Sequence, residues 1–211
     1  MTQPQPTPPT TGSQAWLFFR QWLKNPLSIA ALAPSGTQLA GLMTAELPDD
    51  AKRVIELGAG TGVFTRALID EGIAPEQLLV VELNAELYEH LRGRFPNAQV
   101  VCGDACELTK IAAEKGFARA GEVDAVVSGL GLLNMSRDLQ RAIMRSAFDV
   151  LRPGGSFIQF TYSPKPPLAR GLLDELGLSV RRGGFAWRNI PPASVFVFSR
   201  NRSEQMHAVR S

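Results

Sequence analysis

The chain has 211 residues, of which 45% are hydrophobic and 20% are charged, a composition typical of one globular domain rather than of a disordered chain. No apolar run reaches the roughly 18 residues that span a bilayer, and residues 1–14 lack the regions of a signal peptide. Two cysteines exclude a disulfide scaffold, and no Cys/His cluster has zinc spacing. We therefore expect a cytoplasmic protein without a metal.

Charge is distributed unevenly along the sequence. Residues 1–45 carry a net charge of +2, residues 46–149 carry −6, and residues 150–211 carry +6. This asymmetry suggests that the two ends of the chain face an anionic surface, which is either nucleic acid or lipid. The alternative is that the C-terminal arginines only solvate the surface.

The N-terminal region predicts a tail and two helices. Residues 1–13 are rich in Pro, Thr and Gln, and we expect a disordered tail. Residues 14–24 predict a helix with an apolar face and a basic face, whose main membrane-binding candidates are Trp16, Phe19, Arg20, Trp22 and Lys24. Tryptophans flanked by bases without acids are typical of a helix lying in the bilayer interface, although such a face can also pack on a core. A second helix is expected from the N-cap Ser35 to about Leu47, so that 14–47 forms a membrane-binding region.

From residue 48 to residue 201 the pattern predicts an α/β domain, followed by a tail at 202–211. Short apolar runs alternate with amphipathic stretches, which indicates a mostly parallel sheet with crossover helices. The expected strands are 53–57, 78–82, 99–102, 123–128 and 156–162, and the expected helices include 62–70, 84–94 and 136–151. Residues 152–155 predict a tight turn, and 185–189 with 194–199 predict a C-terminal antiparallel hairpin.

A glycine-rich loop follows the first expected strand. Its sequence, Glu56-Leu57-Gly58-Ala59-Gly60-Thr61-Gly62, has the spacing G-x-G-x-G rather than the dinucleotide spacing G-x-G-x-x-G. Glycines there allow a sharp turn and close approach to a ligand. A carboxylate at Glu56 would repel a pyrophosphate and suits a cation. S-adenosylmethionine fits, because it carries a sulfonium and an ammonium and has no phosphate.

Two further acids close the next two strands. Glu82 lies 20 residues after Gly62, a spacing at which an acid can accept hydrogen bonds from ribose hydroxyls. Asp104 could accept from the adenine amino group. Each acid alone could instead be a helix N-cap or a surface charge. The predicted donor site is completed by their neighbours Leu83 and Ala105 and by Ser128 at the end of the fourth expected strand. Cys102 and Cys106 are interpreted as small apolar packing residues.

Several motifs together resemble a family. They are Phe19-x-x-Trp22-x-x-x-Pro26, Ala33-Pro34-Ser35-Gly36, the 56–64 loop, Ser128-Gly129-Leu130-x-Leu132-Leu133-Asn134, Phe160-Thr161-Tyr162-x-Pro164-x-Pro166-Pro167 and Trp187-Arg188-Asn189-x-Pro191-Pro192-Ala193. The sequence resembles, over nearly all of residues 14–200, the soluble bacterial phospholipid N-methyltransferases that methylate phosphatidylethanolamine. Gly131 stands where this family usually carries proline, which loosens the loop.

The resemblance implies a Rossmann-like class I methyltransferase fold, an S-adenosylmethionine donor and a phospholipid amine as acceptor. It also implies an enzyme associated peripherally with the cytoplasmic membrane through its N-terminal helix. Glu56, Gly58, Gly60 and Glu82 would then be required for donor binding. On the acceptor side the candidates are Tyr162 and Asn134 at the amine, Leu130 and Trp187 beside the substrate, and Lys165 and Arg188 at the lipid phosphate. Phe160, Tyr162 and Trp187 suit a methylated cation, and their alternative role is packing in the core.

Other functions are weighed against this one. Ornithine-lipid methylation is a close variant. An RNA adenine methyltransferase would need an aromatic residue in the 128–134 loop to stack on a flipped base, and the loop has none, so nucleic acid is disfavoured. A non-catalytic membrane-binding module conflicts with the intact acids. The exact head group, the number of methyls added, the catalytic base and the oligomeric state stay open.

Overall fold

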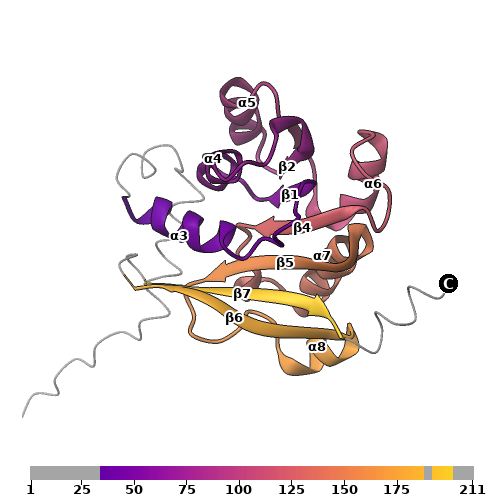
Figure 1. Cartoon of the computed structure of the whole chain (residues 1–211). Coiled ribbons are helices and arrows are strands. Elements are labelled where there is room, and N and C mark those ends of the chain that lie inside the picture. Colours follow the sequence, from indigo (N-terminus) through magenta and orange to yellow (C-terminus); the bar gives the residue numbers. More distant parts are fainter. Residues whose placement is uncertain (1–33, 188–191, 202–211) are drawn as a thin grey trace, which may run out of the picture.

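The computed structural model describes residues 34–187 and 192–201, which fold around one seven-stranded sheet (Figure 1). The strand order is β3-β2-β1-β4-β5-β7-β6. Strands β1 to β5 are parallel to their neighbours among these five, and β7 runs antiparallel to both β5 and β6. This confirms the predicted Rossmann-like sheet with its C-terminal antiparallel hairpin. The strands are β1 Val54–Leu57, β2 Leu78–Glu82, β3 Gln99–Cys102, β4 Val123–Ser128, β5 Leu151–Thr161, β6 Leu178–Ala186 and β7 Ala193–Arg200.

Helices cover both faces of the sheet. The α-helices are α3 Pro34–Thr44, α4 Val63–Asp70, α5 Ala85–Arg94, α6 Leu108–Glu114, α7 Arg137–Val150 and α8 Arg170–Glu175, and short 3-10 turns are η2 Pro75–Gln77, η3 Ala105–Glu107 and η4 Leu132–Asn134. One core cluster joins α3, α4 and α5 to one sheet face, and another joins α6, α7 and α8 to the other face. Every residue of β1 and β2 is buried, as expected for parallel strands covered on both sides.

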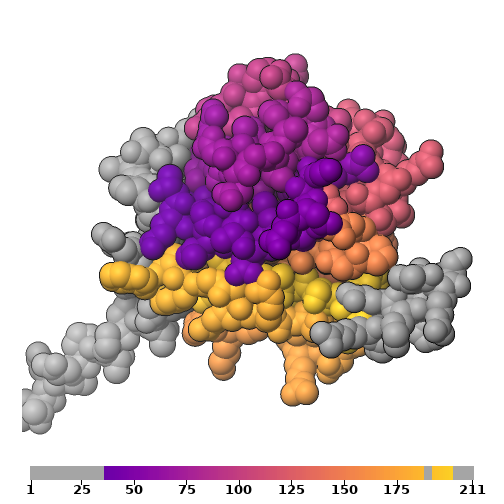
Figure 2. Space-filling model, viewed as in Figure 1, coloured from indigo at the N-terminus to yellow at the C-terminus, as the bar shows by residue number. Residues whose placement is uncertain are grey.

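Helix α3 packs against the edge strand β6, far away in sequence. In the space-filling view the indigo surface of the α3 region lies directly above the gold surface of the hairpin (Figure 2). Arg181 pairs with Glu46 at 2.7 Å. A Cβ on Gly183 would lie 2.5 Å from Glu46 Oε1, and one on Gly184 would lie 2.8 Å from Leu42 Cδ2. The two glycines therefore let the helix region approach the strand closely.

Most element boundaries agree with the sequence prediction. Strands β2, β3 and β4 have the predicted limits. Helices α5 and α7 begin after side-chain caps, since Asn84 accepts from the N–H groups of Glu86 and Leu87 and Ser136 accepts from that of Leu139. Helix α3 ends at Thr44 rather than Leu47.

Strand β5 differs from its prediction. It begins at Leu151, not Ser156. Residues 152–155 were predicted as a tight turn before the strand, but they form a bulge within a continuous strand. The Cα pairing passes from Val123–Leu151 to Ala125–Ser156, and Gly154 takes a φ of 81°. Strand β6 likewise begins seven residues before the predicted 185, at Leu178.

Several predicted features lie outside the described residues. These are the tails, the 14–24 helix with Trp16, Phe19, Arg20, Trp22 and Lys24, and the acceptor candidate Arg188. Within residues 34–187 and 192–201, no helix has the length and apolar character needed to cross a membrane.

Candidate functional site

The glycine-rich loop leaves the end of β1 in a conformation that glycine favours. Gly58, Gly60 and Gly62 all have positive φ, at 67°, 58° and 81°. The Gly58 N–H donates to the Val81 carbonyl of β2 at 2.8 Å, which fixes the loop at the edge of the sheet. A Cβ on Gly58 would lie 2.7 Å from Leu130 Cδ2, so no larger residue fits without rearrangement.

Glu56 is fully buried beneath this loop. The Thr65 hydroxyl donates to Glu56 Oε2 at 2.6 Å, while Oε1 is buried and has no hydrogen-bond partner among the described residues. Burial raises the pKa of Glu56 to about 8, and the nearby Glu82 charge acts in the same direction. A buried carboxyl oxygen without a donor would be satisfied by a cationic N–H group. This observation fits the ammonium of S-adenosylmethionine.

Glu82 joins the glycine-rich loop to the end of β2. Its Oε2 accepts the Gly60 N–H and its Oε1 accepts the Asn84 N–H, both at 2.9 Å. Sequence reasoning predicted a ribose contact and missed this bracing of the loop. The two roles are compatible, because each carboxylate oxygen can accept a second hydrogen bond. The next residue, Leu83, is 70% exposed and offers an apolar surface beside it.

Asp104 follows β3 and caps the short turn η3. Its Oδ1 accepts the Cys106 N–H at 2.9 Å, so the N-cap alternative for this acid is present in the structure. The side chain is exposed, and a ligand contact through its other oxygen stays a prediction. Burial, aided by Asp104, raises the pKa of the Cys106 thiol to about 11. Cys102 is exposed, so its predicted packing role is wrong, whereas Cys106 packs against the core.

The predicted donor residues meet at one edge of the sheet because the carboxyl ends of β1, β2, β3 and β4 lie there. The strand order reverses between β1 and β4, at the usual position of a ligand crevice in such sheets. At this point the Gly129 N–H donates to the Leu57 carbonyl at 2.8 Å. A Cβ on Gly129 would lie 2.6 Å from the Gly58 oxygen, so the loops after β1 and β4 touch through backbone.

Two buried glutamines, which sequence reasoning missed, hold the loop after β4. Gln159 of β5 donates from Nε2 to the Leu130 carbonyl at 2.8 Å. Gln140 of α7 donates from Nε2 to the Leu132 carbonyl at 2.7 Å. A glutamine within the apolar run FIQF of β5 was the available signal. Asn134, at the end of this loop, is exposed.

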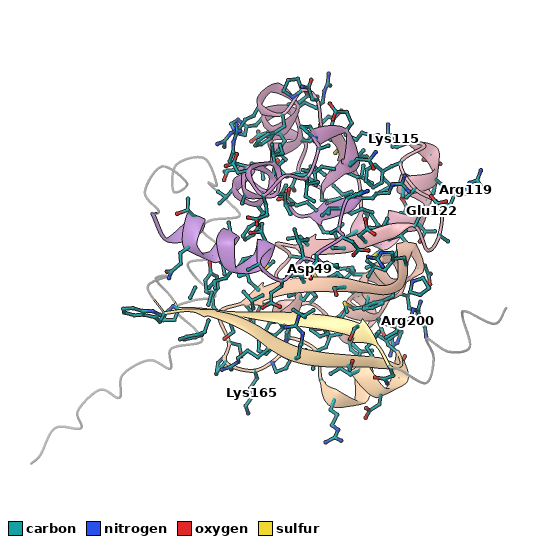
Figure 3. All side chains as sticks on the ribbon, in the orientation of Figure 1. Asp49, Lys115, Arg119, Glu122, Lys165 and Arg200 are labelled. Atoms are coloured by element: carbon teal, nitrogen blue, oxygen red, sulfur yellow. The ribbon has the colours of Figure 1, made fainter. Side chains whose placement is uncertain are left out.

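Three half-buried aromatic rings gather at the end of β5, on the face of the sheet that α4 covers. Phe160 lies 5.6 Å from Tyr162 in an edge-on arrangement and 5.5 Å from Phe64, between ring centroids. Phe64 belongs to the first turn of α4, directly after the glycine-rich loop, and was not predicted. Lys165 and Trp187 are exposed, and Lys165 projects from the surface of the molecule (Figure 3). The described residues contain no group of three or more His, Cys, Asp or Glu that could hold a metal ion.

Comparisons with known proteins agree with this geometry. Residues 54–155 match the family model described as "Methyltransferase domain". The chain is 35% identical over 187 residues to an ornithine lipid N-methyltransferase of Singulisphaera acidiphila, a match covering 86% of this chain and 93% of that relative. The chain belongs to the class I S-adenosylmethionine-dependent methyltransferases.

Solved structures show that this methyltransferase shares its fold with more distant enzymes. A Burkholderia thailandensis 1,6-didemethyltoxoflavin-N1-methyltransferase with bound S-adenosylhomocysteine has a TM-score of 0.61 at 14% identity, covering 94% of this chain and 93% of that one. A magnesium protoporphyrin IX methyltransferase from Synechocystis PCC 6803 with bound S-adenosylmethionine has a TM-score of 0.57 at 13% identity, covering 79% of this chain and 80% of that one. The cofactor of the methyltransferase is S-adenosyl-L-methionine.

Proposed function

We propose that this methyltransferase transfers a methyl group to the primary amine of a membrane aminolipid, with ornithine lipid as the first candidate. The observation that carries the proposal is the extent of the match to the Singulisphaera relative. That match spans 187 residues, whereas the common methyltransferase domain spans only 54–155. The similarity therefore includes segments outside the shared donor-binding part, where acceptor specificity is expected to reside.

Phosphatidylethanolamine is the second candidate head group. The motifs at 160–167 and 187–193, with the N-terminal motifs, favour it through their resemblance to phosphatidylethanolamine methyltransferases. Both lipids present a primary amine close to an anionic group, a carboxylate in one and a phosphodiester in the other. Lys165 is exposed and forms no ion pair among the described residues, and it could contact either anion. We propose that Arg188 contacts the same lipid anion together with Lys165.

We propose that the methyl donor binds at the carboxyl edge of the sheet. S-adenosylmethionine supplies a methyl group on a positively charged sulfur. We assign Glu56 Oε1 to the ammonium of the donor, Glu82 to its ribose and Asp104 to its adenine amino group. The remaining contacts are assigned to Gly58, Ala59, Gly60, Gly62, Leu83, Ala105 and Ser128.

On the acceptor side the chain has to orient an amine and exclude water. The Leu130 carbonyl accepts the Gln159 amide and the Leu132 N–H, and the Leu132 carbonyl accepts the Gln140 amide and the Met135 N–H, so both carbonyls hold the loop in place. Tyr162 and Asn134 are the side chains that we assign to the amine. The aromatic group of Phe64, Phe160 and Tyr162 would stabilise the cation that forms as methyl groups accumulate.

Access to a lipid requires the enzyme to bind a membrane surface. We propose that residues 14–24 provide one attachment on the cytoplasmic side, through Trp16, Phe19 and Trp22, with Arg20 and Lys24 facing anionic lipid. The catalytic domain would then comprise residues 48–201.

The test is methyl transfer from radiolabelled S-adenosylmethionine, with three acceptors supplied separately. The acceptors are vesicles containing ornithine lipid, vesicles containing phosphatidylethanolamine, and total RNA. Label in the ornithine lipid is the expected result. Label in phosphatidylethanolamine alone would transfer the assignment to the second head group, and label in RNA alone would contradict a lipid substrate. The Glu82→Ala variant serves as the control for donor-dependent labelling.

A further inference from the structure

Exposed apolar side chains are concentrated at one edge of the molecule. Among the described residues, the large apolar side chains that are exposed are Leu83, Leu133, Leu139, Phe185 and Trp187. Leu83 follows β2, and Leu133 lies in η4, within the loop after β4. Leu139 lies in the first turn of α7, the helix that returns from that edge. Phe185 and Trp187 lie at the end of β6, which runs in the same direction as β5. All five therefore lie at the carboxyl edge of the sheet.

Four of these residues lie on or beside elements that are joined by one segment of the chain. The segment between β5 and α8 is held on one side by α7, because Gln140 Nε2 donates to the Pro167 carbonyl at 3.4 Å. On the other side Arg182 of β6 donates to the Pro164 carbonyl. The segment thus connects Leu133 and Leu139 with Phe185 and Trp187. Leu83 is set apart, because it lies on the donor side of the sheet.

The same surface carries uncompensated positive charge. Lys165 lies on the connecting segment, and Arg170 is the first residue of α8. The start of α8 lies close to α7, because a Cβ on Gly171 would be 3.8 Å from Arg137 Nη2. Neither Lys165 nor Arg170 forms an ion pair within the described part of the chain. Nearby, Arg137, Arg141 and Arg145 all contact Glu175, and Asp138 offsets Arg141. Apolar side chains beside such cations are the composition of a surface that contacts anionic lipid.

We propose that the carboxyl rim, defined as Leu133, Leu139, Lys165, Arg170, Phe185 and Trp187, docks directly on an anionic bilayer as a second contact apart from residues 14–24. The rim includes Leu133 of the loop after β4 and Leu139 of the helix that follows that loop, so this docking would turn the proposed acceptor site toward the membrane. A lipid could then present its head group while its acyl chains stay in the bilayer. The functional role of this docking rests on the proposed lipid substrate. The experiments below test the docking and the substrate separately.

The first experiment compares two charge-reversed variants of the full chain. One carries Lys165→Glu and Arg170→Glu in the rim. The matched control carries Lys115→Glu and Arg119→Glu, two cations without an ion pair among the described residues, on the far side of the molecule from Lys165 (Figure 3). Binding to phosphatidylcholine vesicles with and without phosphatidylglycerol is measured by co-sedimentation.

Since each basic residue near an anionic surface changes the binding energy by an amount equivalent to about fivefold in affinity, we expect the rim variant to bind phosphatidylglycerol vesicles at least about thirtyfold more weakly than wild type. The control should bind like wild type. Equal losses in both variants, or no loss in the rim variant, would overturn the proposal. Unchanged thermal unfolding of both variants shows that the fold is intact.

The second experiment reports on the rim itself. Trp16→Phe with Trp22→Phe leaves Trp187 as the one tryptophan in the sequence. On vesicles its emission should shift to the blue and be quenched by lipids brominated near the head group. Vesicle-bound protein without quenching would overturn the docking of the rim.

Methyl transfer is measured for wild type and for the same variant on these vesicles with ornithine lipid or phosphatidylethanolamine added. Quenching without label in any lipid supports the rim and contradicts the proposed substrate. Label without quenching supports the substrate and contradicts the rim.

Discussion

At the scale of single residues, Glu56 should make the stability of the ligand-free enzyme depend on pH. Its pKa is raised from 4.5 to about 8 in the folded chain, so within this window the folded state holds a proton that the unfolded state releases. Stability is therefore greatest below pH 4.5 with respect to this group, and it is lost as pH rises toward 8. Thermal unfolding across this range should show a falling Tm that Glu56→Gln flattens. An identical pH profile in the variant would contradict the assignment.

Binding of the donor should lower the raised pKa of Glu56. A cation beside Glu56 Oε1 favours the ionised carboxyl, so binding of S-adenosylmethionine near neutral pH should release a proton. Calorimetric binding enthalpies measured in buffers of different ionisation enthalpy would detect the release, and Glu56→Gln should abolish it.

Glu82 should matter for both affinity and loop shape. Glu82→Ala removes the acceptor for the Gly60 and Asn84 N–H groups and the proposed ribose contact. Hydrogen bonds to a charged group contribute about 1.5–3 kcal/mol each, so donor affinity should fall by at least that amount. Titration calorimetry measures the loss, and circular dichroism monitors folding. Wild-type affinity in a folded variant would remove Glu82 from the donor site.

At the scale of structural elements, the loop after β4 should accept proline at Gly131. The φ of Gly131 is −76°, within the range that proline imposes, and its N–H makes no hydrogen bond among the described residues. Gly131→Pro should therefore retain activity and stabilise the protein by about 0.4–1 kcal/mol, by restricting the unfolded chain. Denaturant unfolding and methyl transfer would check this.

The matched control is Gly129→Ala in the same loop. Its Cβ would lie 2.6 Å from the Gly58 oxygen, so this variant should lose both stability and activity. Lost activity in Gly131→Pro as well would mean that the loop has to move during turnover.

Asp124 ties β4 to the start of β1 and to the bulge of β5. It accepts the N–H groups of Lys52 and Arg53 at 2.8 Å each and the Arg152 guanidinium. Burial opposes ionisation, but these donors outweigh it and lower the pKa of Asp124 below 3.8. Asp124→Asn should destabilise the protein by about 1.5–3 kcal/mol, as measured by denaturant unfolding.

The loss in Asp124→Asn should be complete above pH 3.8 and should shrink as pH falls through the lower folded pKa. Asp149→Asn is the matched control, because Asp149 is 60% exposed and lies 4.0 Å from Arg200. A comparable loss in both variants would contradict a special role for Asp124.

The same elements show what sequence patterns can predict. Strands β2 to β4 and helices α5 and α7 were predictable because apolar runs and side-chain caps mark their ends. Helices α6 and α8 were missed because they are short and begin without a side-chain cap. That the predicted donor residues would lie at one edge of the sheet was predictable from the ends of parallel strands. The bracing glutamines Gln140 and Gln159 were not, because their partners are backbone carbonyls that only the folded chain brings near.

At the scale of the whole molecule, the uneven charge predicts a response to salt. The exposed cations of the proposed rim would act on lipid through solvent, whereas Glu56 and Glu82 are buried. Screening within about 10 Å at 0.1 M salt should therefore weaken binding to anionic vesicles and leave donor affinity unchanged. Co-sedimentation and calorimetry over a salt series would test this. If salt weakened vesicle binding and donor binding equally, this difference between exposed and buried charges would be contradicted.

The backbone contact between Gly58 and Gly129 has a consequence for how binding of the donor and binding of the acceptor affect each other. The two loops meet with no side chain between them, and Leu130 lies against Gly58. We therefore expect a shift of either loop to move the other, so that binding of one substrate changes the free energy of binding of the other. Thermodynamic linkage makes this effect reciprocal: if the donor tightens lipid binding by some factor, the lipid must tighten donor binding by the same factor.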